Sequence, residues 1–427
     1  MKKWAALLAL LVAAFYLVLS GAEVATQRAF IMTAIVLIGV MFDRPALTLR
    51  TICVAALVLL AMAPEAIVHP SFQMSFAATL ALVAVYEGGI RWLSAEPGTP
   101  FAARVALWGG REIAALVLAS VVAGLATTLF AAYHFHRLAP YGVLANLLAM
   151  PAVSIWVMPA GLLGLIALPF GFDRVFWQLM GEGIDWMIVV ATWVAGLPGA
   201  VGRIPAFGVG ALLLGTAGLV VVCLLRSPLR WCGAGLVVLC LLAASAAPRP
   251  DILVSADGGM VAVRDTGGAL RVMATRRDAF ALREWLAADG DARSENDESL
   301  GKGIRCDPTG CVAPLGDGRV VALSIAAEAM IEDCEIAALV VTARNAPTAC
   351  EAPVIDRNAV RAGGAMSGRW INDALLVEAA RPESYRRPWT PARSANPPAP
   401  IRPVAPRDAT PRATDLDADD VPSVAPE

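Results

Sequence analysis

Long apolar runs recur through the first 247 residues, and they constrain the fold more than any other feature of the sequence. A helix rises ~1.5 Å per residue, so about 20 apolar residues cross a hydrocarbon core ~30 Å thick. The runs number nine: Trp4–Ser20, Ala29–Phe42, Thr51–Ala63, Ser71–Tyr86, Ile113–Ala132, Gly142–Leu168, Val175–Leu197, Phe207–Leu225 and Trp231–Ala247. Because backbone polar groups in lipid must be satisfied within the segment, we predict a polytopic α-helical membrane domain over residues 1–247.

The composition excludes a single water-soluble globule. Hydrophobic residues make up 58% of the 427 residues and charged residues 16%, whereas soluble domains average about 25% charged residues. Up to Ala247 the chain has 13 Lys and Arg against 9 Asp and Glu, and beyond it 21 against 27. We therefore expect the two parts to face different solvents.

The basic residues between the apolar runs predict the orientation, because cytoplasmic loops retain positive charge during insertion. With the N-terminus inside, ten of them lie on the inner side: Lys2, Lys3, Arg44, Arg50, Arg91, Arg104, Arg111, Arg174, Arg226 and Arg230. Three lie on the outer side: Arg28, Arg137 and Arg203. This bias predicts a multi-pass membrane protein whose residues after Ala247 are extracytoplasmic.

The first apolar run has a second interpretation as a cleaved signal peptide. Lys2 and Lys3 precede it, and the small residues of Ala22–Ala25 resemble a cleavage site. The topology of the later runs is the same in both cases.

Residues 248–380 have the pattern of a small α+β domain. Asp251–Val263 contains two β-branched runs around an Asp-Gly-Gly turn, and Arg264–Ala274 repeats the pattern, so both are predicted hairpins. Further predicted elements are one helix and two strands: Ala279–Ala288, Val320–Ala326 and Ile336–Thr342. Residues 381–427 contain eleven prolines and few large apolar residues, a composition that predicts a disordered tail.

The eight cysteines divide equally between the two parts. Cys53, Cys223, Cys232 and Cys240 lie in apolar runs, where cysteine usually acts as a small hydrophobic residue. The other four lie in the predicted extracytoplasmic domain: Cys306, Cys311, Cys334 and Cys350. In an oxidising compartment we expect two disulfides, one joining the first two and one the last two. A four-cysteine zinc site would need tighter paired spacing.

Three stretches of the membrane part together resemble the competence domain of the ComEC family. They are Ser20–Met32, Ala63–Ala78 and Asn146–Pro159, and the most specific is Ser-Phe-Gln-Met-Ser-Phe-Ala-Ala at residues 71–78. The resemblance implies an inner-membrane channel for uptake of single-stranded DNA in natural transformation. It also implies an extracytoplasmic DNA receptor, a cytosolic helicase-like motor and a second copy of the chain as partners, besides the lipid bilayer.

The second part resembles the degenerate metallo-β-lactamase-like region of many relatives and closes with Arg386-Arg-Pro-Trp389. The chain departs from the family pattern in two respects. Family members usually begin with an extracytoplasmic domain and further helices, so we expect a truncated gene or a misplaced start. The active lactamase-like domain uses a His-x-His-x-Asp-His motif, whereas the three histidines here are His69, His134 and His136. No metal or other cofactor is therefore predicted.

The segment Tyr141–Phe170 is a candidate pathway element, because its prolines should break the backbone ladder at least twice within the membrane. Freed carbonyls and amides there need water, protein or substrate partners. The candidates in this segment are Asn146, Pro151, Ser154 and Pro159. The alternative is a proline-kinked packing helix.

Polar side chains in three other runs complete the pathway candidates: Arg28, Ser71, Gln73, Ser75, Gln178, Glu182 and Asp185. The last three share one helical face, and intramembrane carboxylates are costly unless they face water or a partner. Alternatively, an interfacial helix could hold them near the headgroups beside Arg174. Ser71, Gln73 and Ser75 are expected on one side of their helix, where such residues usually join helices. His134 and His136 lack a third ligand and are expected at the membrane surface.

The sequence therefore predicts a channel component without enzymatic activity. Two alternatives remain: a membrane-anchored remnant that does not transport, and, against the histidine pattern, a metal-dependent hydrolase.

Overall fold

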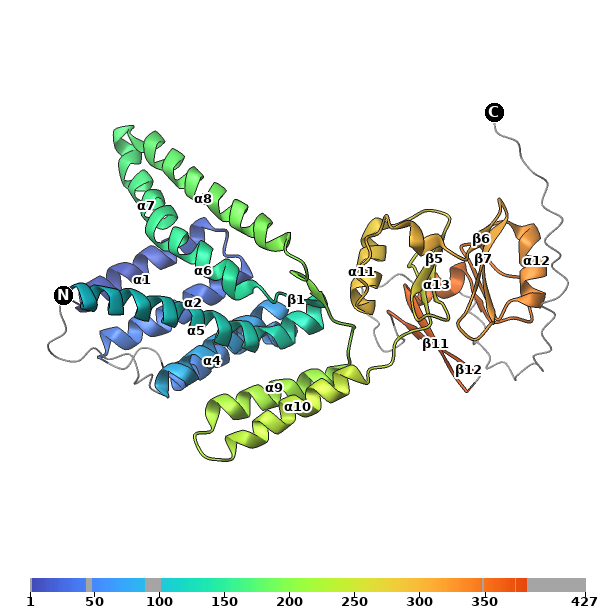
Figure 1. The fold of residues 1–427 in the computed structure, drawn as a ribbon, viewed down its shortest axis with the longest axis horizontal. Helices are drawn as coiled ribbons and strands as arrows, with labels where there is room; N and C mark the ends of the chain where they lie inside the picture. The colour runs from blue at the N-terminus through green and yellow to red at the C-terminus, as the bar shows by residue number, and fades with distance from the viewer. Residues whose placement is uncertain (1, 44–47, 89–100, 348, 373, 382–427) are drawn as a thin grey trace. The chain divides into compact units, whose positions relative to one another are not determined.

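The computed structural model describes residues 2–43, 48–88, 101–347, 349–372 and 374–381 (Figure 1). The predicted tail at 382–427 lies outside these residues. The chain divides into two compact units, one of residues 1–248 with 287–290 and one of residues 249–286 with 291–427. We call them the helical unit and the sheet unit.

The helical unit contains ten α-helices within its described residues. They are α1 (Lys2–Leu19), α2 (Val24–Met41), α3 (Leu49–Met62), α4 (Pro70–Glu87), α5 (Phe101–Phe135), α6 (Gly142–Ala152), α7 (Met158–Ala167), α8 (Asp173–Ala195), α9 (Val209–Leu224) and α10 (Arg230–Ser245). Two short strands, β1 (Arg137–Leu138) and β2 (Gly202–Arg203), pair antiparallel. Each of the nine predicted runs coincides with helix, and the sixth contains both α6 and α7.

The long apolar helices of the helical unit identify the chain as a membrane protein. Three described helical segments are long and apolar enough to cross a bilayer: Lys2–Leu19, Gly109–Phe135 and Gly142–Phe170. Four shorter apolar helices accompany them: Thr26–Met41, Leu49–Met62, Val209–Leu224 and Arg230–Ser245. The count of nine spans therefore stays a prediction.

Contacts at the helix ends join loops that the charge pattern assigns to the same side. At the predicted inner side, Lys3 Nζ lies 2.7 Å from Asp43 Oδ2, and Arg226 Nη2 lies 2.5 Å from Glu87 Oε2. At the predicted outer side, the Tyr141 hydroxyl donates to the Pro198 carbonyl at 3.1 Å. These contacts fit helices that alternate in direction along the chain.

The segment Gly142–Phe170 corrects the prediction of a twice-broken helix. It runs as α6, a π-helical segment Val153–Val157, α7 and a terminal 3₁₀ turn without leaving helical conformation. The Met158 N–H donates to the Val153 carbonyl, five residues back. This longer spacing shifts the hydrogen-bond register just before Pro159, which has no N–H to offer, so the helix continues.

Glycines set the closest helix contacts. A Cβ on Gly218 of α9 would lie 2.8 Å from the Gly233 carbonyl oxygen, and one on Gly233 of α10 would lie 2.7 Å from the Gly218 oxygen. A Cβ on Gly183 of α8 would lie 2.7 Å from Val157 Cγ2. Small residues allow close backbone approach, which is how membrane helices gain packing contacts without a hydrophobic driving force.

The sheet unit contains two five-stranded sheets. The first is antiparallel in the order β12-β11-β3-β4-β5, with strands β3 (Ile252–Val254), β4 (Met260–Arg264), β5 (Leu270–Ala274), β11 (Met366–Ile371) and β12 (Ala374–Ala379). The second has the order β10-β9-β8-β7-β6, with β6 (Arg305–Cys306), β7 (Gly310–Pro314), β8 (Val320–Ser324), β9 (Leu339–Thr342) and β10 (Val354–Ile355). In it, β9 runs parallel to β8 and β10. The unit's helices are α11 (Ala279–Asp289), α12 (Ala327–Ile336) and α13 (Arg357–Gly363).

The strands of the sheet unit alternate between two hydrophobic clusters. Val261 and Val263 of β4 join Leu323 and Val341 of the second sheet in one core between the sheets. Met260 and Ala262 point the other way, into a cluster with Leu282 and Leu286 of α11. On the far side of the second sheet, Ala322 and Val340 pack with Ala337, just after α12. The period-two pattern of burial thus builds a layered sandwich.

The two predicted hairpins and the helix near residue 279 are confirmed, with α11 ending one residue later than expected. The strand predicted at Ile336–Thr342 was wrong at its start, because Ile336 ends α12 and β9 begins at Leu339. Sequence reasoning also missed α12 and α13. Both are short, so their amphipathic patterns carry little signal, and their positions depend on the sheet that they cover.

Candidate functional site

Helix α8 carries a polar face directed away from its own packing contacts. Gln178, Glu182 and Asp185 are exposed, whereas Gly183 and Val190 are buried. With ~100° between successive helical residues, Asp185 and Gly183 point about 160° apart. The three polar residues thus share the side of α8 that lies opposite its contacts with α6, α7 and the π-helical segment.

The opposite face of α8 packs on α6, α7 and the π-helical segment. Trp156 Nε1 donates to the Leu179 carbonyl at 2.8 Å, and Trp186 Nε1 donates to the Leu148 carbonyl at 3.4 Å. A Cβ on Gly164 would lie 3.1 Å from the Trp177 ring. Trp156 and Trp186 therefore join helices, which favours packing over base stacking for both.

Asp185 lies near the middle of α8, twelve residues after Asp173 in a 23-residue helix, or ~18 Å along the axis at ~1.5 Å per residue. α8 is not among the described helices whose length and hydropathy fit a membrane span. Both predictions for its carboxylates, a wet membrane interior and an interfacial helix, therefore stay predictions. In a helix that crosses the bilayer, a carboxylate facing lipid at mid-depth costs about 2.5–3.5 kcal/mol.

The predicted polar stripe of α4 was wrong, because Ser71 and Ser75 share a face but Gln73 lies about 160° from Ser71 in an α-helix. Gln73 instead joins helices. Its Nε2 donates to the Ile67 carbonyl at 2.9 Å, and its Oε1 lies 2.8 Å from His134 Nε2 at the end of α5. His69 caps α4, with its Nδ1 accepting from the Ser71 N–H at 3.3 Å. These contacts make Gln73 and His134 structural ties.

The remaining membrane candidates differ in exposure. Asn146, Pro151, Ser154 and Pro159 are exposed along α6, the π-helical segment and α7. Arg28 of α2 is buried, with 9% of its surface exposed. Its Nε and Nη1 have no hydrogen-bond partner within the described part of the chain. The ion pairs of that part join neither Arg28 nor Arg50 to Glu182 or Asp185.

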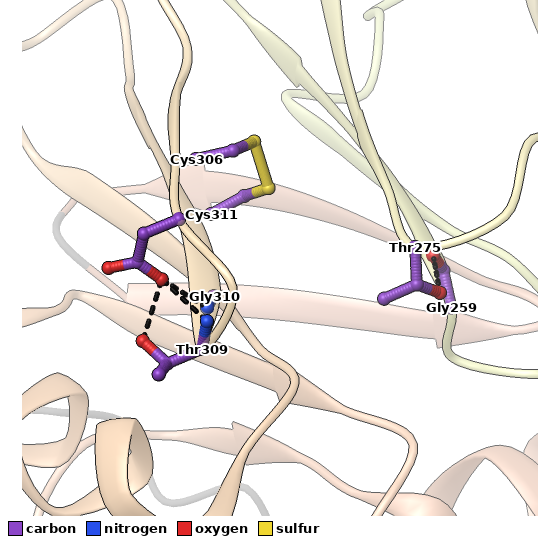
Figure 2. The surroundings of a disulfide bond; sticks show 7 residues. Gly259, Thr275, Cys306, Thr309, Gly310 and Cys311 are labelled. Carbon is purple, nitrogen blue, oxygen red and sulfur yellow. Dashed lines mark hydrogen bonds between the residues drawn. A yellow bond between two sulfur atoms is a disulfide. The ribbon is translucent and has the colours of Figure 1, made fainter. Parts of the chain in front are cut away.

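In the sheet unit, Cys306 pairs with Cys311 and Cys334 with Cys350. Figure 2 shows the first disulfide beside the loop that it closes. Asp307 Oδ1 accepts from the Thr309 hydroxyl at 2.6 Å, the Thr309 N–H at 2.7 Å and the Gly310 N–H at 2.8 Å. These hydrogen bonds hold the pKa of Asp307 below its ordinary value, led by the Thr309 hydroxyl.

Asp333, next to the second disulfide, is buried and accepts a hydrogen bond from the Ser324 hydroxyl. Burial raises the pKa of Asp333, against the lowering effect of that hydrogen bond. Within the described residues no three His, Cys, Asp or Glu side chains gather in a metal-binding arrangement.

Comparison with known proteins decides the family. Residues 1–229 match the model of the competence protein family, more than half of the chain. This chain belongs to the competence protein family. The match covers α1 to α9 and ends just before α10, the last helix of the helical unit.

A curated relative is ComE operon protein 3 of Bacillus subtilis (strain 168), which is 24% identical over 196 residues. The aligned region is 45% of this chain and 23% of that protein. This chain therefore spans about a quarter of the length of the relative that it matches. No solved structure matches it significantly.

Two features of the site escaped sequence reasoning. The unsatisfied burial of Arg28 has no signature in the sequence, because it depends on which helices surround α2. The close approach of Gly218 and Gly233 has a weak signature in the sequence, since both lie in apolar runs where small residues often mark helix contacts.

Proposed function

We propose that this competence-family protein takes part in DNA uptake for transformation, as a component of a path for single-stranded DNA across the bacterial inner membrane. The family match over residues 1–229 supports the process. The path is argued from the polar face of α8, whose Gln178, Glu182 and Asp185 are exposed. The proposal takes α8 to cross the bilayer, where such a face fits a membrane interior that contains water.

The charges of α8 limit its role in such a path. Glu182 and Asp185 would repel the phosphates of a DNA strand, so we assign them to the wetting or gating of the path and not to DNA binding. The exposed Asn146 and Ser154 on the neighbouring helix are neutral and can accept or donate hydrogen bonds. They are better candidates for contact with a passing strand.

The proposal includes the surroundings of the protein. The helical unit would span the inner membrane and the sheet unit, a degenerate lactamase-like domain over residues 248–380, would lie on the outer side. An extracytoplasmic DNA receptor would deliver the strand, and a cytosolic helicase-like motor would draw it inward. A second copy of the chain would complete the path.

Thiol accessibility tests the path. In a background with the four unpaired cysteines of the helical unit replaced by alanine, Asp185→Cys should react with a membrane-impermeant cationic thiol reagent in proteoliposomes. We expect Val190→Cys, on the buried face of the same helix, to react at least an order of magnitude more slowly. Attachment of a bulky reagent at residue 185 should also reduce entry of a labelled oligothymidylate, measured by protection from external nuclease.

Equal protection of both thiols would show that the outward face of α8 is sealed by lipid or protein, and the path would lie elsewhere. If Asp185→Cys reacts but no oligonucleotide enters, this face of α8 is in contact with water but is not part of a path for DNA.

The sheet unit should neither bind catalytic metal nor cleave DNA. A two-metal site needs several ligands converging on ions ~3.5–4 Å apart, and this unit has no histidine. Residues 248–380 also carry 14 Arg and Lys against 20 Asp and Glu, a balance that disfavours DNA binding. We expect no cleavage when residues 251–391 are incubated with single- or double-stranded DNA and Mn²⁺ or Zn²⁺. Cleavage that a chelator abolishes, and that persists on further purification, would contradict this.

A further inference from the structure

Arg28 is a buried cation, and two of its three guanidinium nitrogens have no hydrogen-bond partner among the described residues. Its guanidinium Nε and Nη1 are buried and have no partner among the described residues, and the side chain is 9% exposed. Burial of a charge without a partner is strongly unfavourable, so a chain that keeps such an arginine is expected to satisfy it with a group from outside.

No carboxylate of the described residues fills this role. The ion pairs of that part join other residues, and none includes Arg28. The neighbouring Gln27 is engaged elsewhere, since its Nε2 donates to the Ala22 carbonyl at 2.7 Å. The described residues therefore supply no anion for Arg28.

The position of Arg28 fits an anion that arrives from the membrane surface. Arg28 is the fifth residue of α2, only ~6 Å from the start of the helix at ~1.5 Å per residue. That end of α2 lies on the side predicted to be extracytoplasmic.

We infer that Arg28 binds a phosphate group through its planar guanidinium. Arginine pairs with phosphate through two parallel N–H donors, a geometry that lysine cannot reproduce. Two sources supply this chemistry: a phosphodiester of an entering DNA strand and the headgroup of a phospholipid. Only the first source rests on the proposed function.

This inference predicts an unusual stability pattern. Replacing an arginine that is paired with protein groups destabilises the protein. Replacing an unsatisfied buried charge by an apolar side chain of similar volume instead removes the free-energy penalty of burying that charge. Arg28→Met should therefore raise the midpoint of thermal unfolding in phosphate-free maltoside detergent by about 2–4 °C. The same substitution should abolish the response to phosphate.

The experiment compares four forms of the full chain: wild type, Arg28→Met, Arg28→Lys and the matched control Gln27→Met. Each is unfolded in detergent at constant ionic strength with inorganic phosphate, oligothymidylate or phosphatidylglycerol, and with sodium chloride as reference. We expect phosphate compounds to raise the midpoint of wild type and of Gln27→Met, to raise that of Arg28→Lys less, and to leave Arg28→Met unchanged. If Arg28→Met does not fold, the comparison of Arg28→Lys with Gln27→Met decides.

The outcomes separate the sources. A rise of the unfolding midpoint with oligothymidylate identifies a DNA phosphodiester as the ligand. A rise with phosphatidylglycerol alone identifies a lipid headgroup as the ligand of Arg28 and shows that Arg28 does not bind DNA. An Arg28→Met protein less stable than wild type, or equal responses of all four forms, would overturn the inference and make Arg28 a structural residue.

Discussion

A periplasm-active reporter fused after Pro248 will be active, and the same reporter fused after Arg226 will be inactive. The ten basic residues of the inner loops and the three of the outer loops predict opposite sides for these two points. The ion pair between Arg226 and Glu87 places the ends of α4 and α9 together, as the charge pattern requires. The expected difference is all or none, because a reporter enzyme folds on one side only.

A cytoplasm-active reporter at the same two points is the control and should give the inverse pattern. The opposite result would remove one span from the predicted nine. The prolines of Gly142–Leu168 could favour a re-entrant hairpin, but the helix continues to Phe170. The opposite result would therefore point to α3, whose 14 residues reach only ~21 Å at ~1.5 Å per residue, or to α8, which is not among the described helices long and apolar enough to cross a bilayer.

Gly218→Leu will separate α9 from α10. Its side chain would start 2.8 Å from both the Gly233 carbonyl oxygen and Val237 Cγ2, and the backbone oxygen cannot move without shifting the whole helix. Overpacking of this kind costs about 1–3 kcal/mol or more. We expect a lower free energy of unfolding in detergent, measured by denaturant titration, and an increased reactivity of Cys240 toward thiol reagents.

Gly210→Leu is the matched control, because it adds the same side chain to the same helix at a position where nothing lies within 4 Å of the added Cβ. It should leave both measurements close to those of the wild type. If the two variants behaved alike, the close contact of Gly218 with Gly233 would not hold the helices together.

Much of the local structure could be predicted, because its signals are local. The apolar runs coincide with helices, and the Asp-Gly-Gly turn at residues 257–259 lies between β3 and β4 as its sequence indicates. The prolines of Gly142–Phe170 have no N–H to donate, but the two breaks in the helix that this predicted were wrong. Whether a helix breaks or shifts its register also depends on neighbours such as α8, which packs on this segment.

The site was less predictable. The spacing of Gln178, Glu182 and Asp185 establishes that they share a face, since helical periodicity is fixed by backbone geometry. It does not establish which face packs, and the contacts of Gly183 with Val157 and of Trp156 with Leu179 decide that. The stripe on α4 failed for a simpler reason, because residues two apart lie on opposite sides of a helix.

The sequence by itself determined that the first 247 residues belong to a membrane, where the basic loops should lie, and that the second part forms strands and turns. These properties depend on hydropathy, charge and dihedral preference, which act over a few residues. The tertiary structure alone decided that α8 turns its carboxylates away from its neighbours, and that Nε and Nη1 of Arg28 are buried without a hydrogen-bond partner among the described residues. Burial and pairing are properties of contacts between segments far apart in the chain, and no local pattern encodes them.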